Sequence, residues 1–394
     1  MTIKIVQSLN QLKQFDDYIW FPNAVLKTIG YEFPQKPTSK WLLCLKRALT
    51  LLEISAHFYC SGYSIKQMYD IAQNGMPNVP LFLRLTSSLM YTISGDVKLL
   101  NFVIHLKQSK TMFKRFQDIY PQSLEELHSY RVNQHFWPSW VNVILYFYLV
   151  STFFIIISPI GEAILLYIYE LLTVGYAEAH FSYLKCYEIT YSFDHRSPLA
   201  YALAYSLESF YSHFIVIGNI SVDIWLLSYA MQLCMHFDYI SRELEMYEPN
   251  EEHADADIKF IADLVSKHQI VLRLSNEINT IFGMLLLFLL LSMCGVLCCV
   301  GVYMMVMGMG RELLTYVAFL LTAVGQYYVI CYYGQRLIIL SKNIGNSAYN
   351  HRWYMASPSY KKSILIILIR AQKEADLNAN GMQPISFEAF KIVT

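Results

Sequence analysis

The chain has 394 residues, of which 55% are hydrophobic and only 15% are charged, and its formal net charge is zero. Its mean hydropathy is +0.33. An ordinary soluble domain is more polar and more highly charged than this. The composition therefore excludes a soluble globular protein and predicts an all-α protein that crosses the lipid bilayer several times, with no nucleic acid among its partners.

The N-terminal third is predicted to hold two membrane spans. Residues 1–40 form a cytoplasmic segment, within which the amphipathic stretch 15–31 lies at the inner membrane interface. Two helices follow at 41–63 and 79–106, and a bilayer is crossed by about 20 apolar residues. The second helix is expected to continue as one long cytoplasmic helix over 99–127, because its apolar residues recur at helical spacing.

The middle of the chain is predicted to hold two more spans and a long loop. Residues 141–160 form an apolar run without an ionised side chain, and 197–218 form a span that extends inward to about Arg242. Between them, the tyrosine-rich segment 161–198 is expected to be an outer loop folded as a lid, because long structureless loops are uncommon. A short acidic link, 243–257, follows the fourth span.

The last third is predicted to hold three spans. A helix over 258–281 rises into the fifth span, 281–307, which has no ionised side chain, and 312–331 form the sixth. A cationic aliphatic helix over 359–373 and a polar turn come next, and a final helix restarts after Ile385.

Two carboxylates, Glu208 and Asp223, fall inside the fourth predicted helix. A carboxylate at membrane depth costs about 2.5 to 3.5 kcal/mol on insertion scales, so both are expected to face protein or water. They are 15 residues apart in the sequence, about 22 Å along a helix, too far to act together as a carrier or enzyme site. We expect Asp223 to anchor a helix.

Lys and Arg fall mainly on one side of the predicted spans. Residues 1–40, 107–131, 242–273 and 336–373 hold 21 of them, and the three alternate connections hold four. Cationic loops resist translocation. The N-terminus is therefore expected in the cytoplasm and, with seven spans, the C-terminus outside.

Known catalytic and metal-binding motifs are absent from the sequence, and its eleven histidines are scattered. We expect polar packing roles for the histidines, no metal, no cofactor and no enzymatic activity. Of the eight cysteines, only Cys186 falls in a predicted outer loop, so no disulfide framework is predicted.

Aromatic residues are abundant, with 31 Tyr and 23 Phe, and many fall in the outer halves of the predicted spans. Residues three or four apart share a helix face, and pockets for small ligands combine apolar walls with a few polar orienting groups. Bundle packing and interfacial aromatic belts explain any single member better, whereas the set as a whole favours a pocket for a small apolar ligand. The candidate ligand-binding residues are Ser87, Met90, Tyr91, Phe147, Ser151, Phe154, Ile155, Tyr205, Glu208, Ser209, Tyr211, Tyr303, Tyr316 and Phe319.

The C-terminal block has a distinctive order of residues after the sixth span. Its distinctive residues are Tyr332, Tyr333, Gly334, Ser341, Ser347, Ala348, Tyr349, Trp353, Ser386 and Phe390. A last loop with a helical hairpin would account for part of this pattern. In order, spacing and composition, however, the block resembles the insect odorant receptor family over residues 334–390.

The resemblance implies a subunit of a ligand-gated, non-selective cation channel with seven helices, in the plasma membrane of olfactory sensory neuron dendrites. The family's co-receptor carries a long cytoplasmic insertion where this chain has only the short link 243–257, which points to an odour-specific tuning subunit. Its implied partners are co-receptor subunits in a heterotetramer and a small volatile ligand. The implied subunit anchor includes Tyr349, Trp353 and Tyr360.

The resemblance also implies a division of the chain into an interfacial segment (1–40), six spans with the ligand pocket in their outer half (41–342), a cytoplasmic anchor helix and turn (343–384), and the start of the pore-lining helix (385–394). Family members continue past the position of Thr394 with the residues that carry the pore gate. The last helix is therefore expected to be incomplete here, and no gate residue is predicted. The alternatives are a gustatory receptor of the same superfamily or a membrane carrier.

Overall fold

The structure is a computed structural model that describes residues 13–28, 40–76, 78–136, 139–173, 180–187, 189–194, 197–307 and 313–393. Within these ranges the chain is mostly helical and has no β-strand beyond an isolated bridge between Asn378 and Pro384. The predicted all-α fold is confirmed. In chain order the helices are α2 (Phe15–Thr28), α3 (Lys40–Gln73), α4 (Val79–Ile104), α5 (Leu106–Ile119), α6 (Leu124–Ser129), α7 (Val132–His135), α8 (Ser139–Thr173), α9 (Pro198–Met246), η1 (Glu251–His253), α10 (Ala254–Met307), α11 (Leu313–Asn350), η2 (Trp353–Met355), α12 (Pro358–Ala371) and α13 (Phe387–Val393).

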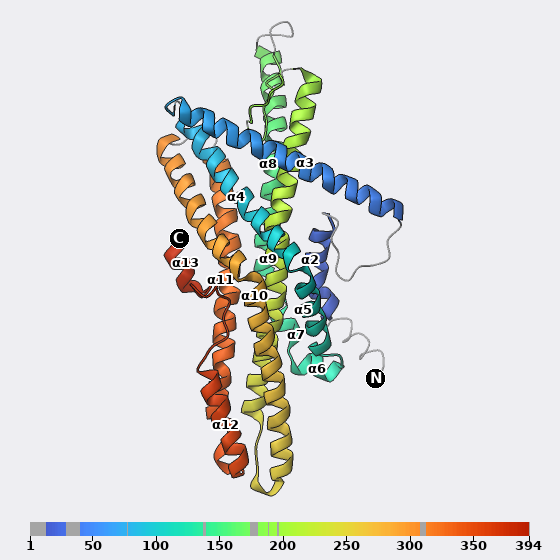
Figure 1. Ribbon diagram of the computed structural model, residues 1–394, viewed down its shortest axis with the longest axis vertical. Coiled ribbons are helices and arrows are strands. Elements are labelled where there is room, and N and C mark those ends of the chain that lie inside the picture. The colour runs from blue at the N-terminus through green and yellow to red at the C-terminus, as the bar shows by residue number, and fades with distance from the viewer. Residues whose placement is uncertain are drawn as a thin grey trace.

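Helix α9 is the central column of the bundle (Figure 1). It contacts α2, α3, α4, α8, α10 and α11, and every residue from 217 to 237 is buried. A helix that is apolar around its whole circumference is covered on all sides in this way. Where α4 crosses α9, Gly95 and Gly218 lie face to face, and a Cβ at Gly218 would stand only 3.4 Å from the carbonyl oxygen of Gly95.

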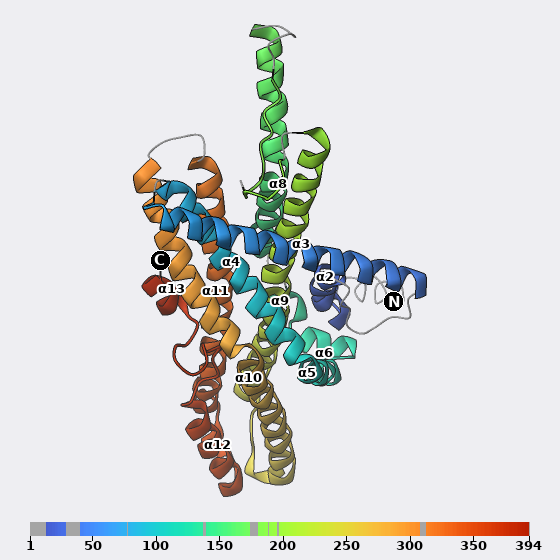
Figure 2. The same cartoon turned by 45° about the horizontal axis from the view of Figure 1, so that its top comes forward.

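Three helical stretches of the described chain are long and apolar enough to cross a membrane, namely Ile156–Thr173, Pro198–Met246 and Glu251–Val306. The C-terminal end of α8 and the N-terminal end of α9 project at one end of the molecule. At the other end, the lower parts of α9 and α10 lie beside α11 and α12 (Figures 1 and 2). We call these the loop end and the α12 end. Helix α3 crosses the bundle obliquely near the loop end (Figure 2).

Helix α2 has the amphipathic pattern predicted for residues 15–31. Its buried face, which includes Phe15 and Tyr18, packs against the bundle, whereas Trp20 is 70% exposed. The hydroxyl of Ser228 on α9 donates to the carbonyl oxygen of Tyr18 at 3.1 Å. This contact fixes α2 against the central column.

The prediction of one long helix over 99–127 is wrong. Helix α4 ends at Ile104 and α5 begins at Leu106, and the ring nitrogen Nδ1 of the intervening His105 is 3.0 Å from the carbonyl oxygen of Asn101. Such side-chain bonds compete with the helical backbone pattern. Pro121 follows the end of α5, and Ser123 then opens α6 through a capping box with Glu126.

The boundary predicted for the loop over 161–198 is also wrong, because α8 continues to Thr173. Gly161 costs a helix only about 1 kcal/mol, and the aliphatic residues that follow it favour helix. The later part of the segment does return to the bundle. The hydroxyl of Tyr201 on α9 donates to the carbonyl oxygen of Leu184 at 2.6 Å, which holds this part against α9.

Candidate ligand site

Aromatic and other apolar residues at the loop end surround a buried carboxylate, Glu208 of α9. These residues come from α3, α4, α9 and the loop residues 187 and 189–193, and we call them the loop cluster. Glu208 itself has no solvent exposure. The loop cluster comprises Cys60, Ile189, Tyr191, Ala204, Tyr211 and Ile215, with Tyr63, Tyr91, Tyr187, Phe193 and Leu207 packed against them.

Both oxygens of Glu208 accept hydrogen bonds from the folded loop. The backbone N–H of Tyr187 donates to Oε2 at 2.9 Å, and the hydroxyl of Tyr191 donates to Oε1 at 3.1 Å. Burial, together with the nearby Glu208 carboxylate, raises the pKa of Tyr191, so that its hydroxyl keeps its proton and can donate. Because a buried carboxylate without such donors is costly, these two bonds hold the loop against α9.

Tyr211 is buried between α4 and the loop. Its hydroxyl lies 3.0 Å from Oγ1 of Thr92 on α4, and its ring meets that of Tyr187 edge to face with centroids 5.2 Å apart. The hydroxyl of Ser212, the next residue on α9, donates to the hydroxyl of Tyr187 at 2.9 Å. Tyr187 of the loop therefore packs against two consecutive side chains of α9, those of Tyr211 and Ser212.

Helix α3 is attached to this end of the bundle by polar side chains. Nε2 of the buried His57 lies 3.0 Å from Oδ1 of Asp96 on α4. Nδ1 of His213 on α9 lies 3.1 Å from Oε1 of Glu53, an ion-pair distance without hydrogen-bond alignment. Together these contacts hold α3 to both α4 and α9.

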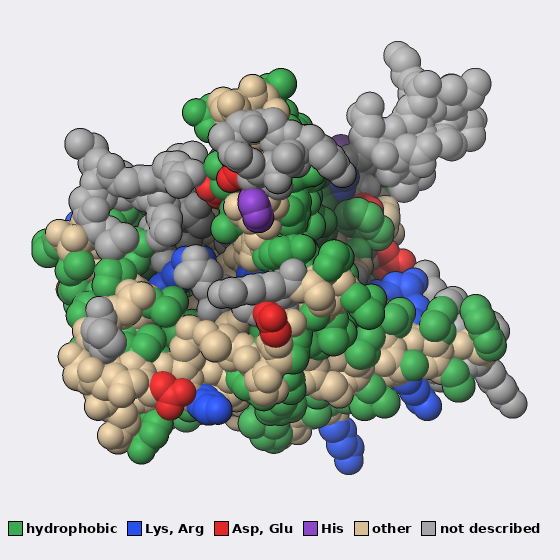
Figure 3. Space-filling model, turned by 90° about the horizontal axis from the view of Figure 1, so that it is seen from above, with side chains coloured by type: hydrophobic (Ala, Val, Ile, Leu, Met, Phe, Trp, Pro, Cys, Tyr) green, Lys and Arg blue, Asp and Glu red, His purple; other side chains and the backbone are tan. Residues whose placement is uncertain are grey.

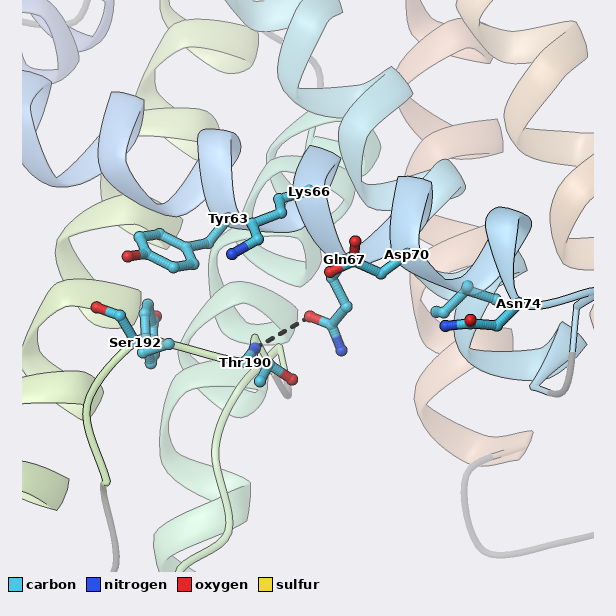
Figure 4. A pocket seen from close by; sticks show the side chains of 9 residues that line it. Tyr63, Lys66, Gln67, Asp70, Asn74, Thr190 and Ser192 are labelled. Carbon is cyan, nitrogen blue, oxygen red and sulfur yellow. Dashed lines mark hydrogen bonds between the residues drawn. The ribbon is translucent and has the colours of Figure 1, made fainter.

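A polar groove of about 270 Å³ lies between α3 and the loop (Figure 4). The side-chain oxygen of Gln67 accepts a hydrogen bond from the backbone N–H of Thr190 at 3.0 Å across it. Seen from this end, the described surface carries only scattered charged side chains (Figure 3). The groove is lined by Tyr63, Lys66, Gln67, Asp70, Ile71, Asn74, Thr190, Tyr191 and Ser192, so it shares Tyr63 and Tyr191 with the loop cluster.

The structure brings several of the predicted ligand-binding residues to this region. Tyr91, Glu208 and Tyr211 belong to or adjoin the loop cluster. The hydroxyl of Tyr205 donates to the carbonyl oxygen of Ile156 on α8, and that of Ser209 donates to the carbonyl oxygen of Tyr205 at 2.8 Å. The hydroxyl of Ser209 is thus engaged by its own helix.

A second group of predicted residues lies on the other side of α4, toward α10. Tyr303 is buried with Val296 and Val300, and Leu83 of α4 packs against them. Met90 faces Gly295 so closely that a Cβ at Gly295 would stand 2.6 Å from the Met90 sulfur. The hydroxyl of Ser87 donates to the carbonyl oxygen of Arg84 at 3.0 Å.

The remaining candidates are placed differently. Phe154 is 46% exposed on α8. The side chains of Phe147, Ser151, Ile155, Tyr316 and Phe319 lie outside those that the structure describes.

The sequence analysis did not single out several residues of the loop cluster, namely Cys60, Tyr63, Thr92, Tyr187, Ile189 and Tyr191. Tyrosines at 183, 187 and 191 recur at regular intervals in the long loop, and this was the available signal. Their contact with Glu208 depends on where the loop turns back toward α9, which composition does not specify.

The residues that follow the sixth predicted span fasten the chain near the α12 end. The hydroxyl of Ser341 accepts from the backbone N–H of Ala375 at 3.0 Å, and that of Ser347 lies 2.8 Å from the hydroxyl of Ser241 on α9. At Gly334, a Cβ would stand 2.1 Å from the carbonyl oxygen of Ile385. The small residues of the motif therefore allow the chain before α13 and the backbone of α9 to lie against α11.

The three predicted anchor residues differ in exposure. Tyr360 of α12 is fully buried and its hydroxyl lies 3.2 Å from Nε2 of His351. Tyr349 is 68% exposed, and the indole N–H of Trp353 donates to its carbonyl oxygen at 3.2 Å. Tyr360 thus holds α12 to α11, whereas Tyr349 faces outward.

The fold and this geometry define a class: a helical membrane protein with an aromatic cluster closed by a folded loop at one end. The sequence profile described as 7tm Odorant receptor matches residues 78–394. The chain therefore belongs to the odorant receptor family, whose members are receptors and not enzymes. This match also decides between the odorant and gustatory families considered from the sequence.

Two relatives from Drosophila melanogaster match nearly the whole chain. Odorant receptor 49a is 29% identical over 386 residues, covering 98% of this chain and 96% of the relative. Odorant receptor 85f is 32% identical over 378 residues, covering 96% and 94%. These insect receptors agree with the family indicated by the C-terminal motif.

The same fold is found in solved structures of the insect olfactory receptor OR5 from Machilis hrabei. One superposes with a TM-score of 0.72, covering 96% of this chain and 94% of that chain. A second, in complex with eugenol, superposes with a TM-score of 0.74, covering 96% and 95%. Because sequence identity is only 13% in both cases, the likeness to these structures concerns the fold alone.

Proposed function

We propose that this chain is the odour-specific tuning subunit of a ligand-gated, non-selective cation channel formed with co-receptor subunits in the plasma membrane of olfactory neurons. A small volatile binds between the helices at the loop end and opens the pore. The observation that supports this most directly is the convergence of aromatic rings with a few placed polar groups in the loop cluster. The structural neighbour solved with eugenol supports a ligand of similar size.

The proposed topology has seven spans, with a cytoplasmic N-terminus and an extracellular C-terminus. The spans are α3, α4, α8, α9, α10, α11 and the helix that begins with α13. Three of them have the necessary length and hydropathy among the described residues. The distribution of Lys and Arg supports this orientation, which makes the loop end the extracellular end.

The ligand packs against the rings and aliphatic side chains on either side of α4, with Met90, Tyr91, Tyr211 and Tyr303 as walls. Glu208 holds the loop that closes this region, because both of its oxygens bind loop donors. The ligand favours the open state only by its higher affinity for that state. For about ten heavy atoms, bounded near 1.5 kcal/mol per atom and usually far below it, micromolar potency is expected.

The α12 end provides the contact with other subunits. One face of α12 packs inside the chain through Ile364 and Ile367, whereas Leu365, Ile366 and Ile369 on the other face are exposed. An exposed apolar patch of this kind marks an interaction surface. In the proposed channel, it faces a co-receptor subunit.

The test is to express the chain in oocytes with and without an insect co-receptor and to record currents while a panel of volatiles is applied. An odour-gated cation current that requires both subunits supports the proposal. No current, despite surface expression of both subunits, contradicts it.

A ring substitution tests the site. Tyr211→Phe removes the hydroxyl that meets Thr92, a bond whose loss is expected to raise the half-maximal odorant concentration about fivefold without lowering the maximal current. Tyr169→Phe is the matched control, because Tyr169 is 65% exposed on α8. Equal potency of both variants would show that Tyr211 is not part of the ligand site.

A further inference from the structure

An ion pair is buried in the middle of the bundle, away from the loop cluster. Nζ of Lys98 on α4 lies 2.8 Å from Oδ2 of Asp223 on α9, and the side chains are 1% and 8% exposed. The side-chain amide of Gln326 on α11 donates to the same carboxylate oxygen. One oxygen atom thus joins three helices that are far apart in the sequence.

Burying such a pair costs desolvation free energy, so the pair contributes little to holding the helices together. The attraction between two buried charges scarcely repays their desolvation, and apolar residues of similar volume often stabilise a fold as well or better. Charged residues within membrane-spanning helices are accordingly rare and mark functional positions. A role beyond simple packing is therefore expected for Lys98 and Asp223.

On one side, the pair is connected to the ligand region through Asn219. Lys98 Nζ donates to the carbonyl oxygen of Asn219 at 3.4 Å, and the Asn219 amide donates to the carbonyl oxygen of Tyr91 at 3.0 Å. A Cβ at Gly95 would stand 2.8 Å from that amide nitrogen. The crossing of α4 and α9 is too close for either helix to shift at Tyr91 without moving its neighbour.

On the other side, Gln326 directly precedes two tyrosines that pack against α13. The ring of Tyr327 stacks on Phe390 with centroids 5.8 Å apart, and that of Tyr328 stacks on Phe387 at 5.8 Å. Helix α13 is the start of the proposed pore helix. The carboxylate of Asp223 therefore lies between the ligand region and the pore helix in a continuous series of contacts.

We propose that Lys98, Asp223 and Gln326 form a positioning triad that couples the ligand site to the pore helix. The inference rests on the proposed function. A ligand that displaces α4 at Tyr91 moves α9 and Asp223 with it, and the amide of Gln326 passes this displacement to α11 and its tyrosines. The triad is not among the proposed wall residues, so it sets the balance between closed and open states for every odorant alike.

Gln326 provides the sharpest test, because it is neutral and its removal leaves Lys98 and Asp223 paired. Gln326→Met keeps the length of the side chain and removes the bond. With the co-receptor present, we expect an approximately fivefold change in the open–closed equilibrium, as for the loss of one hydrogen bond. The change is measured with weak partial agonists, whose maximal current per receptor at the surface is proportional to this equilibrium constant. The current should change by the same factor for every such odorant tested.

The control on the same helix is Leu321→Met, which alters a side chain that is 56% exposed. Tyr211→Phe serves as the second comparison, because a wall residue shifts the potency of different odorants by different factors. A Gln326→Met receptor that matches the original chain for every odorant overturns the triad, and so does a shift that differs from odorant to odorant. An original chain that gives no odour-gated current refutes the proposed function instead.

Variants of the charged pair keep the proposal testable if Gln326→Met fails to reach the surface. Asp223→Leu alone leaves the ammonium group of Lys98 buried without a counter-ion and should reduce surface expression, whereas Lys98→Met with Asp223→Leu should restore it. The triad predicts that the restored double variant still shows the uniform change in maximal current. Normal gating in the double variant would show that the pair only supports folding and would overturn the proposal.

Discussion

At the scale of single residues, Gly334 is the glycine, among those that the structure describes, whose added Cβ would lie closest to a neighbouring atom. A methyl group there would overlap the carbonyl oxygen of Ile385, since the two atoms would lie 2.1 Å apart. Backbone cannot swing aside as a flexible side chain can. The chain leading into α13 can therefore lie against α11 only while residue 334 is glycine.

We predict that Gly334→Ala lowers the free energy of unfolding by about 3 kcal/mol or more, at the upper end of the cost of overpacking. The measurement is the thermal stability of the detergent-solubilised receptor, followed by size-exclusion chromatography. Gly301→Ala is the control, because nothing lies within 4 Å of the Cβ that it adds. Equal stability of the two variants would contradict the close approach at Ile385.

The two carboxylates of α9 show what can be predicted from the sequence for single residues. Hydropathy alone required Glu208 and Asp223 to face protein or water, and both are buried in the bundle with partners. It did not identify Lys98 as the partner of Asp223. The rotation of α4 about its axis relative to α9 depends on the Gly95–Gly218 crossing, which neither helix reveals by itself.

At the scale of elements, the junction of α11 and α12 contains a pH-sensitive contact. His351 is buried, and its two ring nitrogens face the carbonyl oxygen of Ala348 at 3.0 Å and the hydroxyl of Tyr360 at 3.2 Å. A neutral ring, donating to the first and accepting from the second, fits both. Burial lowers the pKa of His351 below its ordinary value of 6.5.

We predict that this junction loses stability as the pH falls below about 6.5. The unfolded chain then binds a proton at His351 that the folded chain does not, and the contribution declines as the pH approaches the folded pKa. Unfolding of the purified receptor at pH 7.5 and 5.5 measures the effect. His351→Asn should reduce the difference between the two pH values, and an unchanged difference would exclude His351 as its source.

A second prediction at this scale concerns the exposed face of α12. Ile366→Glu with Ile369→Glu should abolish co-purification with the co-receptor, because charges replace apolar side chains that we propose to be covered in the channel. Lys362→Glu, at an exposed polar position of the same helix, is the control. If the double variant assembles as well as the control, subunit contact does not use this face.

Element boundaries were the weakest part of the sequence analysis. Its positions for α9, α12 and α13 agree with the structure to within a few residues, because strong apolar runs and turn residues bound them. The break at His105 was not predicted, since no proline or glycine stands there and the side-chain contact with the carbonyl oxygen of Asn101 is visible only in the structure. The extension of α8 beyond Gly161 was not predicted, because glycine commonly marks the end of a helix.

At the scale of the whole molecule, the orientation in the membrane is open to a direct test. In the proposed topology, Leu199→Cys, at a residue that is 84% exposed at the loop end, should react with a membrane-impermeant maleimide on intact cells. Glu251→Cys at η1 should react only after permeabilisation. The unmodified chain measures the background from its own cysteines, and the opposite labelling pattern would invert the topology.

Composition predicted the class of fold and the C-terminal motif predicted the family, because both are properties of the local sequence. The association of the long loop with Glu208 and the joining of three helices at Asp223 were not predictable from it. The joining of three helices depends on contacts between residues more than 100 positions apart, as for Lys98 with Asp223 and Gln326 with Asp223. The association of the loop with Glu208 depends on where the loop turns back, since its donors Tyr187 and Tyr191 stand 21 and 17 residues before Glu208. Such contacts exist only once the bundle has formed.

The buried ion pair also has a consequence for biosynthesis. Lys98 precedes Asp223 by 125 residues, and at about 5 to 20 residues per second the ribosome needs roughly 6 to 25 seconds to cover that distance. In the proposed topology, α4 enters the membrane during this interval while the ammonium group of Lys98 has no carboxylate to pair with. The cell must therefore shelter the nascent chain, or keep α4 from settling in lipid, until α9 arrives.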